Sequence, residues 1–195
     1  MASAYLLGCV TTAYYLVKWR KGLDIRERHS GTVGATNAGR LLGAPGFALT
    51  FVLDFAKGAV AVWSALRLFP DRQVAAAAML AVVLGHIWPA QLGFRGGKGM
   101  SAAMGGLAIF APWTLLAALA LTGLLCALIR VFKPASLLAV GLTPLASAAL
   151  RPSLPEWVAT LALTVVVLWA HRRDLVHEWR KLRNRASSEQ GIKPL

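Results

Sequence analysis

Long apolar runs alternate with short polar connections along almost the whole chain. Each run is rich in Ala, Leu and Val, and most are long enough for a helix that crosses a bilayer. We therefore predict an all-α, polytopic membrane helix bundle that forms a single integral membrane domain over residues 1–195. The seven predicted transmembrane helices cover residues 2–17, 46–66, 74–92, 100–112, 113–129, 135–150 and 156–170, and a basic cytoplasmic tail follows at 171–195.

Proline and charge positions define two of these segments. Pro112 lacks an amide proton and disfavours helix at the preceding residue, so the apolar stretch from residue 100 to 129 is divided there. The first run, residues 2–17, is short for a span. Its cations follow the apolar residues, whereas a secretory signal peptide carries them before its apolar region. We expect this run to stay in the protein as a span.

The basic residues are unevenly distributed between the connections. Of the 21 Lys and Arg residues, Arg67, Arg72 and Arg151 lie in connections assigned to the outside, Lys57 lies within a span, and the other 17 lie inside. This bias predicts an N-terminus outside and a C-terminus in the cytoplasm. It also explains the net charge of +13 better than a nucleic-acid partner does. With 57% hydrophobic residues and a mean hydropathy of +0.58, an ordinary soluble domain is excluded.

A glycine-rich stretch between the third and fourth predicted spans is the first candidate for chemistry. Residues 93–99 read Gly-Phe-Arg-Gly-Gly-Lys-Gly. Successive glycines can turn several backbone amides toward one point, and Lys98 adds a positive charge. The helix predicted from Met100 offers its N-terminal amides at the same place. We interpret the stretch as a phosphate site; a tight turn whose charge serves topology is the alternative, and the spacing does not match a Walker A loop.

A second glycine-rich run, residues 30–40, is predicted on the same face of the membrane. That face collects hydroxyl, amide, imidazole and cationic donors but few carboxylates, which suits phosphate groups better than a metal. We expect no metal and no cofactor. The donors on this face are Ser30, Thr32, Thr36, Asn37, Arg40, Lys98, Ser136 and His171.

Three ionisable residues are predicted within spans. Asp54 and Lys57 are three residues apart, so they can neutralise each other on one helix face, and we favour a structural role for the pair. His86, at the end of the third span, is either a catalytic residue or a packing residue beside Trp88. The two cysteines lie far apart in apolar runs and are interpreted as packing residues.

Two long motifs resemble one known family. Residues 30–37 read Ser-Gly-Thr-Val-Gly-Ala-Thr-Asn and are followed by Arg40. Gly85-His86 is followed by Pro89 and by the Phe-Arg-Gly-Gly-Lys-Gly sequence of residues 94–99. Both are similar to motifs of the bacterial acyl-phosphate:glycerol-3-phosphate acyltransferases, the PlsY family, and the resemblance extends over nearly the whole chain.

The resemblance implies an inner-membrane enzyme whose active site faces the cytoplasm. It would transfer a fatty acyl group from acyl-phosphate to the 1-hydroxyl of sn-glycerol 3-phosphate, giving lysophosphatidate and phosphate in the first acylation of phospholipid synthesis. Its partners would be these two substrates and membrane lipids. Matched by position, the catalytic residues are His86, Lys98 and His171, and the substrate or phosphate ligands are Ser30, Thr32, Asn37, Arg40, Gly96, Gly97, Lys98, Gly99, Ser136 and Asp174.

Two positions depart from the family pattern in ways that bear on phosphate binding. Thr32 and Asp174 stand where the family usually has Asn. Asp174 places a negative charge where an amide would face phosphate. We expect it to be neutralised by Arg172 or Arg173, or to mark a weakly active relative or one with altered substrate preference.

A different function class fits the same basic face. A transporter or binding protein for a phosphorylated anion would also place cations on a polytopic chain. It would need polar residues inside several spans and repeated halves. Only Asp54 and Lys57 lie deep in a predicted span, and no repeat is visible. The sequence leaves acyl-chain preference and oligomeric state open, a monomer included.

Overall fold

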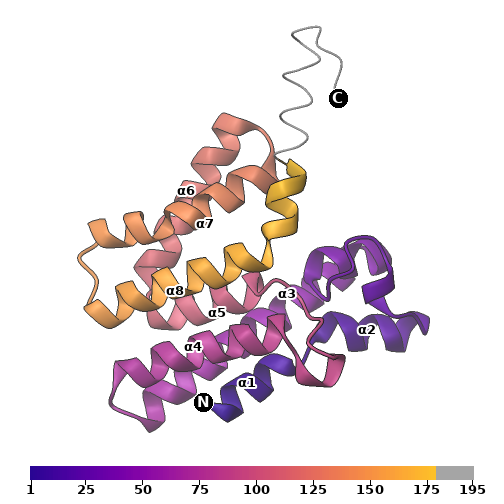
Figure 1. The fold of residues 1–195 in the computed structure, drawn as a ribbon, viewed down its shortest axis with the longest axis horizontal. Helices are drawn as coiled ribbons and strands as arrows, with labels where there is room; N and C mark the ends of the chain where they lie inside the picture. The colour runs from indigo at the N-terminus through magenta and orange to yellow at the C-terminus, as the bar shows by residue number, and fades with distance from the viewer. Residues whose placement is uncertain (179–195) are drawn as a thin grey trace, which may run out of the picture.

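The computed structural model describes residues 1–178, and all regular structure in that range is helical (Figure 1). The predicted all-α class is therefore confirmed. Residues 179–195, the larger part of the predicted basic tail, lie outside the described residues. The helices are α1 Ala2–Cys9, α2 Thr12–Lys21, α3 Ala35–Leu68, α4 Arg72–Ile87, α5 Met100–Phe110, α6 Pro112–Ile129, α7 Phe132–Ala149 and α8 Leu154–Ala170, with single 3-10 turns η1 Ile25–Glu27 and η2 Ala90–Leu92.

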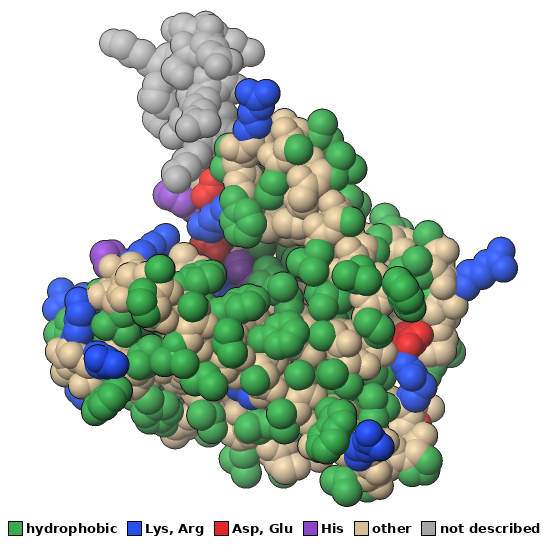
Figure 2. All heavy atoms as spheres, turned by 180° about the vertical axis from the view of Figure 1, so that it is seen from behind, with side chains coloured by type: hydrophobic (Ala, Val, Ile, Leu, Met, Phe, Trp, Pro, Cys, Tyr) green, Lys and Arg blue, Asp and Glu red, His purple; other side chains and the backbone are tan. Residues whose placement is uncertain are grey.

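Three helical segments in the described chain are long and apolar enough to cross a membrane. They are α3, α6 and the segment Arg72–Leu92, which joins α4 to η2. A fourth follows if α8 and the short helix Arg172–Glu178, bent by 63° relative to it, are taken as one span. Apolar side chains cover much of the face shown in Figure 2. Trp113 and Leu128, on α6, are 72% and 70% exposed, as expected for side chains that contact lipid rather than water.

The division at Pro112 is confirmed. Proline is the first residue of α6, a position at which its missing amide proton costs no helical hydrogen bond. Ala111, just before it, has left the helical region with φ of −146° and ψ of 69°. The local rules for proline thus fix the boundary between α5 and α6.

The first predicted helix, residues 2–17, is corrected by the structure. Its segment forms two short helices, α1 and α2, because Val10 and Thr11 have extended backbone conformations. The break exposes the carbonyls of Gly8 and Val10, and both accept hydrogen bonds from Lys57 of α3. A broken helix is tolerated in an apolar bundle when a neighbouring element satisfies the freed backbone groups.

Other boundaries differ from the prediction by about one to three helical turns. Helix α3 begins at Ala35 and bends at Gly43, where φ is +73°, so part of the predicted polar connection is helical. The third predicted span, 74–92, ends as α4 at Ile87, and η2 follows. Helix α7 begins at Phe132, which places Lys133 inside its first turn rather than in the connection.

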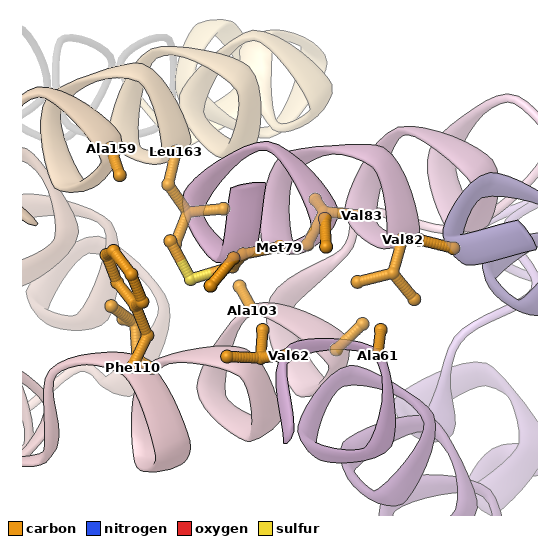
Figure 3. Packing of buried hydrophobic residues seen from close by; sticks show 14 of the residues in the cluster. Ala61, Val62, Met79, Val82, Val83, Ala103, Phe110, Ala159 and Leu163 are labelled. Atoms are coloured by element: carbon orange, nitrogen blue, oxygen red, sulfur yellow. The ribbon is translucent and has the colours of Figure 1, made fainter. Parts of the chain in front are cut away.

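The main core lies where α3, α4, α5 and α8 meet (Figure 3). Val62, Met79 and Val82 are fully buried there, and Phe110 and Leu163 close the cluster from α5 and α8. Small residues let the helices approach closely. A Cβ atom at Gly58 of α3 would overlap the backbone of α5, so these helices pack at backbone distance. This packing holds the start of α5 and the end of α4 in one fixed arrangement.

Candidate functional site

The glycine-rich stretch of residues 93–99 folds back onto the end of α4. The Gly96 amide donates to the Ile87 carbonyl over 3.1 Å, and the Gly97 amide donates to the His86 carbonyl over 3.0 Å. A Cβ atom at Gly97 would overlap the His86 ring. These two glycines therefore shape the loop. Their amides are hydrogen-bonded within the protein, and phosphate binding by these two glycines stays a prediction from the sequence.

Gly99 positions Lys98. Gly99 has φ of +80° and immediately precedes α5, so the chain turns sharply and Lys98 lies just before the first turn of that helix. The first amides of a helix have no acceptor within it. Lys98 and the start of α5 together keep the anion-binding character that the sequence predicted for the stretch as a whole.

The two glycine-rich runs lie side by side, as expected for a shared site. The Val33 amide donates to the Gly96 carbonyl over 3.4 Å. The guanidinium of Arg26 donates to the Leu92 carbonyl over 2.8 Å and pairs with the carboxylate of Asp24 at 2.6 Å. The hydrogen bond from Arg26 lowers the pKa of Asp24, so the ion pair between Arg26 and Asp24 stays charged at neutral pH.

Asn37 holds the first run rather than presenting its amide to a ligand. The residue is 1% exposed, and its side-chain nitrogen donates to three backbone carbonyls of the preceding loop at 2.9, 3.1 and 3.1 Å. Ser30 and Thr32 lie nearer the surface, and their hydroxyls are 3.0 Å apart. Arg40 is exposed on the first part of α3. These three residues, unlike Asn37, are accessible to a ligand.

A cluster of charges joins Lys98 to the far end of the chain. The Asp174 carboxylate, beyond the end of α8, is bonded to Lys98 through one oxygen and to Lys133 through the other, the latter at 2.8 Å. His171 lies within the electrostatic range of all three. Figure 2 shows cationic, acidic and imidazole side chains gathered at a hollow. Residues from three helix ends thus meet at one place.

Asp174 is neutralised, although not by the residues the sequence suggested. Arg172 and Arg173 were the expected partners, but the carboxylate pairs with Lys98 and Lys133 instead. Burial acts to raise the pKa of Asp174, but the hydrogen bonds and charges of the two lysines outweigh it and lower the pKa. Asp174 is therefore ionised at neutral pH and makes a doubly paired anion within the site.

His171 has a defined tautomer. Its Nδ1 atom lies 2.8 Å from the Val167 carbonyl, which can only accept, so Nδ1 carries the proton and Nε2 is the acceptor in the neutral ring. Burial lowers the pKa of His171, and the charge of Lys98 adds to this effect. At neutral pH the ring is therefore neutral and can take a proton at Nε2.

A second polar cluster is buried behind the glycine-rich stretch. Lys57 Nζ lies 2.9 Å from Asp54 Oδ1, which confirms the predicted pair. The same nitrogen donates to the carbonyls of Gly8 and Val10 at 3.1 and 2.8 Å, and Thr12 donates its hydroxyl to Asp54 over 3.2 Å. The side chains of Lys57 and Asp54 are only 6% and 1% exposed. The pair joins the break between α1 and α2 to α3.

His86 belongs to this buried cluster. Its Nδ1 lies 2.9 Å from Lys57 Nζ, and because a protonated amine can only donate, the ring proton is on Nε2. The residue is 3% exposed, and its ring occupies the space that a side chain at Gly97 would need. Direct catalysis by His86 stays a prediction from the resemblance, while its contacts indicate that it supports the loop carrying Lys98.

Sequence reasoning did not select Lys133, which was counted only as a cation that sets topology. The sequence feature that could have identified Lys133 is its position three residues before Ser136, because residues three apart share one face of a helix. The Ser136 hydroxyl donates to the Lys133 carbonyl over 3.0 Å, so both lie on the first turns of α7. Within residues 1–178, no group of three or more His, Cys, Asp or Glu residues could hold a metal ion.

Comparisons with known proteins agree over nearly the full length. The family model for glycerol-3-phosphate acyltransferase matches residues 1–181. The glycerol-3-phosphate acyltransferases of Desulfitobacterium hafniense and Myxococcus xanthus are each 37% identical, covering 96% and 93% of this chain and 91% and 95% of their own. The crystal structure of PlsY, an integral membrane glycerol 3-phosphate acyltransferase, in its glycerol 3-phosphate form is similar with a TM-score of 0.85 and 31% identity, covering 92% of this chain and 90% of that one. The lysophosphatidic acid form of PlsY is similar with a TM-score of 0.80 and 29% identity, and the match covers 91% of this chain and 89% of that one.

Proposed function

The chain belongs to the glycerol-3-phosphate acyltransferase family, and from this membership we propose that it takes a fatty acyl group from acyl-phosphate and passes it to the 1-hydroxyl of sn-glycerol 3-phosphate. The protein is a membrane acyltransferase of phospholipid synthesis that converts glycerol 3-phosphate to lysophosphatidate. The proposal adds the acyl-phosphate donor, inorganic phosphate as the second product, and the residues that act.

The observation that carries the proposal is the arrangement of Lys98, Lys133 and His171 beside an apolar groove. The groove lies between α5, α6, α7 and α8, and its lining includes Met100 and Val167. Met100 is two residues from Lys98, and Val167 accepts the hydrogen bond from His171. A phosphate held by the lysines would thus lie near the end of a groove that suits a fatty acyl chain.

The reaction needs no covalent enzyme intermediate. The glycerol hydroxyl oxygen attacks the acyl carbon, the bond from that carbon to the phosphate oxygen breaks, and phosphate leaves with the bonding electrons. The hydroxyl proton passes either to His171 Nε2 or to the phosphate of the substrate itself. Because phosphate is already a good leaving group, the protein contributes mainly alignment and positive charge around the departing anion, and Lys98 supplies part of that charge.

A donor assay tests the proposal. Purified protein in detergent, supplied with acyl-phosphate and glycerol 3-phosphate, should release phosphate and form lysophosphatidate in equal amounts. Acyl-CoA in place of acyl-phosphate should give no product. Product from acyl-CoA but none from acyl-phosphate would show that the donor is wrong while leaving the acceptor intact.

We also propose that the site faces the cytoplasm of a bacterial inner membrane. The support is the excess of cations in the connections predicted to lie inside, which include those that carry Ser30 and Lys98. In a background with Cys9 and Cys126 replaced, a cysteine at Ser30 should resist a membrane-impermeant thiol reagent in intact cells, and one at Asp71 should react. Labelling at Ser30 from outside would reverse the assignment.

A further inference from the structure

Lys133 belongs to the charge cluster because it forms an ion pair with Asp174. The carboxylate places one oxygen on Lys98 and the other on Lys133, at 2.8 Å for the second. The three groups come from separate parts of the fold: the turn before α5, the first turn of α7 and the segment after α8. In Figure 1 that last segment, drawn in yellow, runs from α8 toward the region where α6 and α7 are joined. The carboxylate therefore holds the two ammonium groups together.

Asp174 alone does not cancel the charge of the two lysines. Two ammonium groups and one carboxylate leave one positive charge, and the carboxylate of Glu178 offsets it only through a longer contact, 3.6 Å from Lys133. A carboxylate bound between two lysines occupies the position that any anion of similar size would take. Phosphate offers more oxygen acceptors and a higher charge than a carboxylate, so it competes well for the same donors.

Accessibility separates this bridge from an ordinary structural ion pair. The side chains of Lys98, Asp174 and Lys133 are 23%, 15% and 43% exposed. A soluble anion can therefore reach the lysines without unfolding the bundle. The buried pair of Lys57 and Asp54, at 6% and 1%, has no such access.

We propose that Lys133 is a further substrate-binding residue, which holds the substrate phosphate together with Lys98, and that Asp174 competes with that phosphate for the two lysines. In the free protein Asp174 stands in for the phosphate. When glycerol 3-phosphate binds, its phosphate takes over the donor of at least one lysine. The inference rests on the proposed site, but not on the identity of the acyl donor.

Direct binding of glycerol 3-phosphate to the detergent-purified protein, measured by calorimetry without a donor, tests the inference. Lys133→Ala should weaken binding about tenfold or more, the size of one lost charge-assisted hydrogen bond. Asp174→Asn should tighten binding about threefold or more, because it removes the competing anion. Arg130→Ala, which removes an exposed cation three residues before Lys133, is the matched control and should change binding less than twofold.

The inference predicts opposite changes in glycerol 3-phosphate binding for the two variants, weaker for Lys133→Ala and tighter for Asp174→Asn. Lys133→Ala and Asp174→Asn break the same bridge, so a purely structural bridge would make both variants less heat-stable and both weaker in binding. Equal weakening in the two variants, or unchanged binding in Lys133→Ala, would overturn the inference. If the unaltered protein binds glycerol 3-phosphate but fails in the donor assay, the donor assignment fails while this test still applies.

Discussion

Replacing Lys57 with Met should destabilise the protein without removing a catalytic group. Methionine keeps most of the side-chain volume but removes every donor. Asp54, 1% exposed, then loses its cation, and one of its oxygens, Oδ2, already has no partner among the described residues. The carbonyls of Gly8 and Val10 lose their donor as well. The variant thus leaves the buried Asp54 carboxylate without its cation, and it leaves the Gly8 and Val10 carbonyls without the donor that Lys57 supplied.

The magnitude follows from the loss of one member of a buried ion pair. Such a change costs about 3–5 kcal/mol, and each unsatisfied carbonyl adds about 1–3 kcal/mol where water cannot reach it. These costs overlap, so we expect roughly 3–5 kcal/mol in total. For a chain of this size, each kcal/mol shifts the unfolding midpoint by about 2–4 °C, which gives a drop of about 6–20 °C.

Thermal unfolding in one detergent, with acyl transfer measured well below the midpoint, provides the assay. Asp54→Asn together with Lys57→Met should be more stable than Lys57→Met alone, because the uncompensated charge is gone. The residual activity per folded molecule should stay within about threefold of the unaltered protein for both. A Lys57→Met variant with an unchanged midpoint and no turnover would refute the reasoning and move the reactive centre into α3.

Three further predictions concern the exposed site. Lys98→Ala should reduce phosphate release about 10²-fold or more in a folded protein, roughly 3 kcal/mol of transition-state stabilisation, and near-normal turnover would exclude Lys98 from the site. Gly97→Ala should raise KM for glycerol 3-phosphate, because the new Cβ atom meets the His86 ring and displaces the loop. Its loss of heat stability should be smaller than that of Lys57→Met. An unchanged KM would show that the loop tolerates the shift. The pKa of His171 is lowered, so Nε2 takes up its proton only below pH 6.5. The rate of acyl transfer should therefore be constant from pH 7.5 to 6.5 and fall at lower pH. Asp174→Asn should move the midpoint of this fall to still lower pH, because it removes a negative charge that raises the pKa of His171. A midpoint above 6.5 in the pH–rate profile would contradict that sign.

Local features of the sequence were enough to predict the class of fold and several of its parts. The apolar runs predicted helices, and the residues of the described chain that form regular structure are helical. Pro112 divided α5 from α6 as expected, because proline acts on its own residue and the one before it. Asp54 and Lys57 could be paired because three residues separate them on one helix face. The distribution of cations among the connections likewise predicted the two glycine-rich runs on one face of the membrane.

Contacts between distant residues decided the rest. The break at Val10 carries no glycine or proline, and it is satisfied by Lys57, 47 residues away. Asp174 pairs with Lys98, 76 residues earlier, and with Lys133, rather than with the arginines beside it in the sequence. A sequence pattern reports which groups are near one another along a single element. Whether a carbonyl finds a donor, or a carboxylate finds its cations, depends on which helix ends the packed core brings together, and only the tertiary structure determines that.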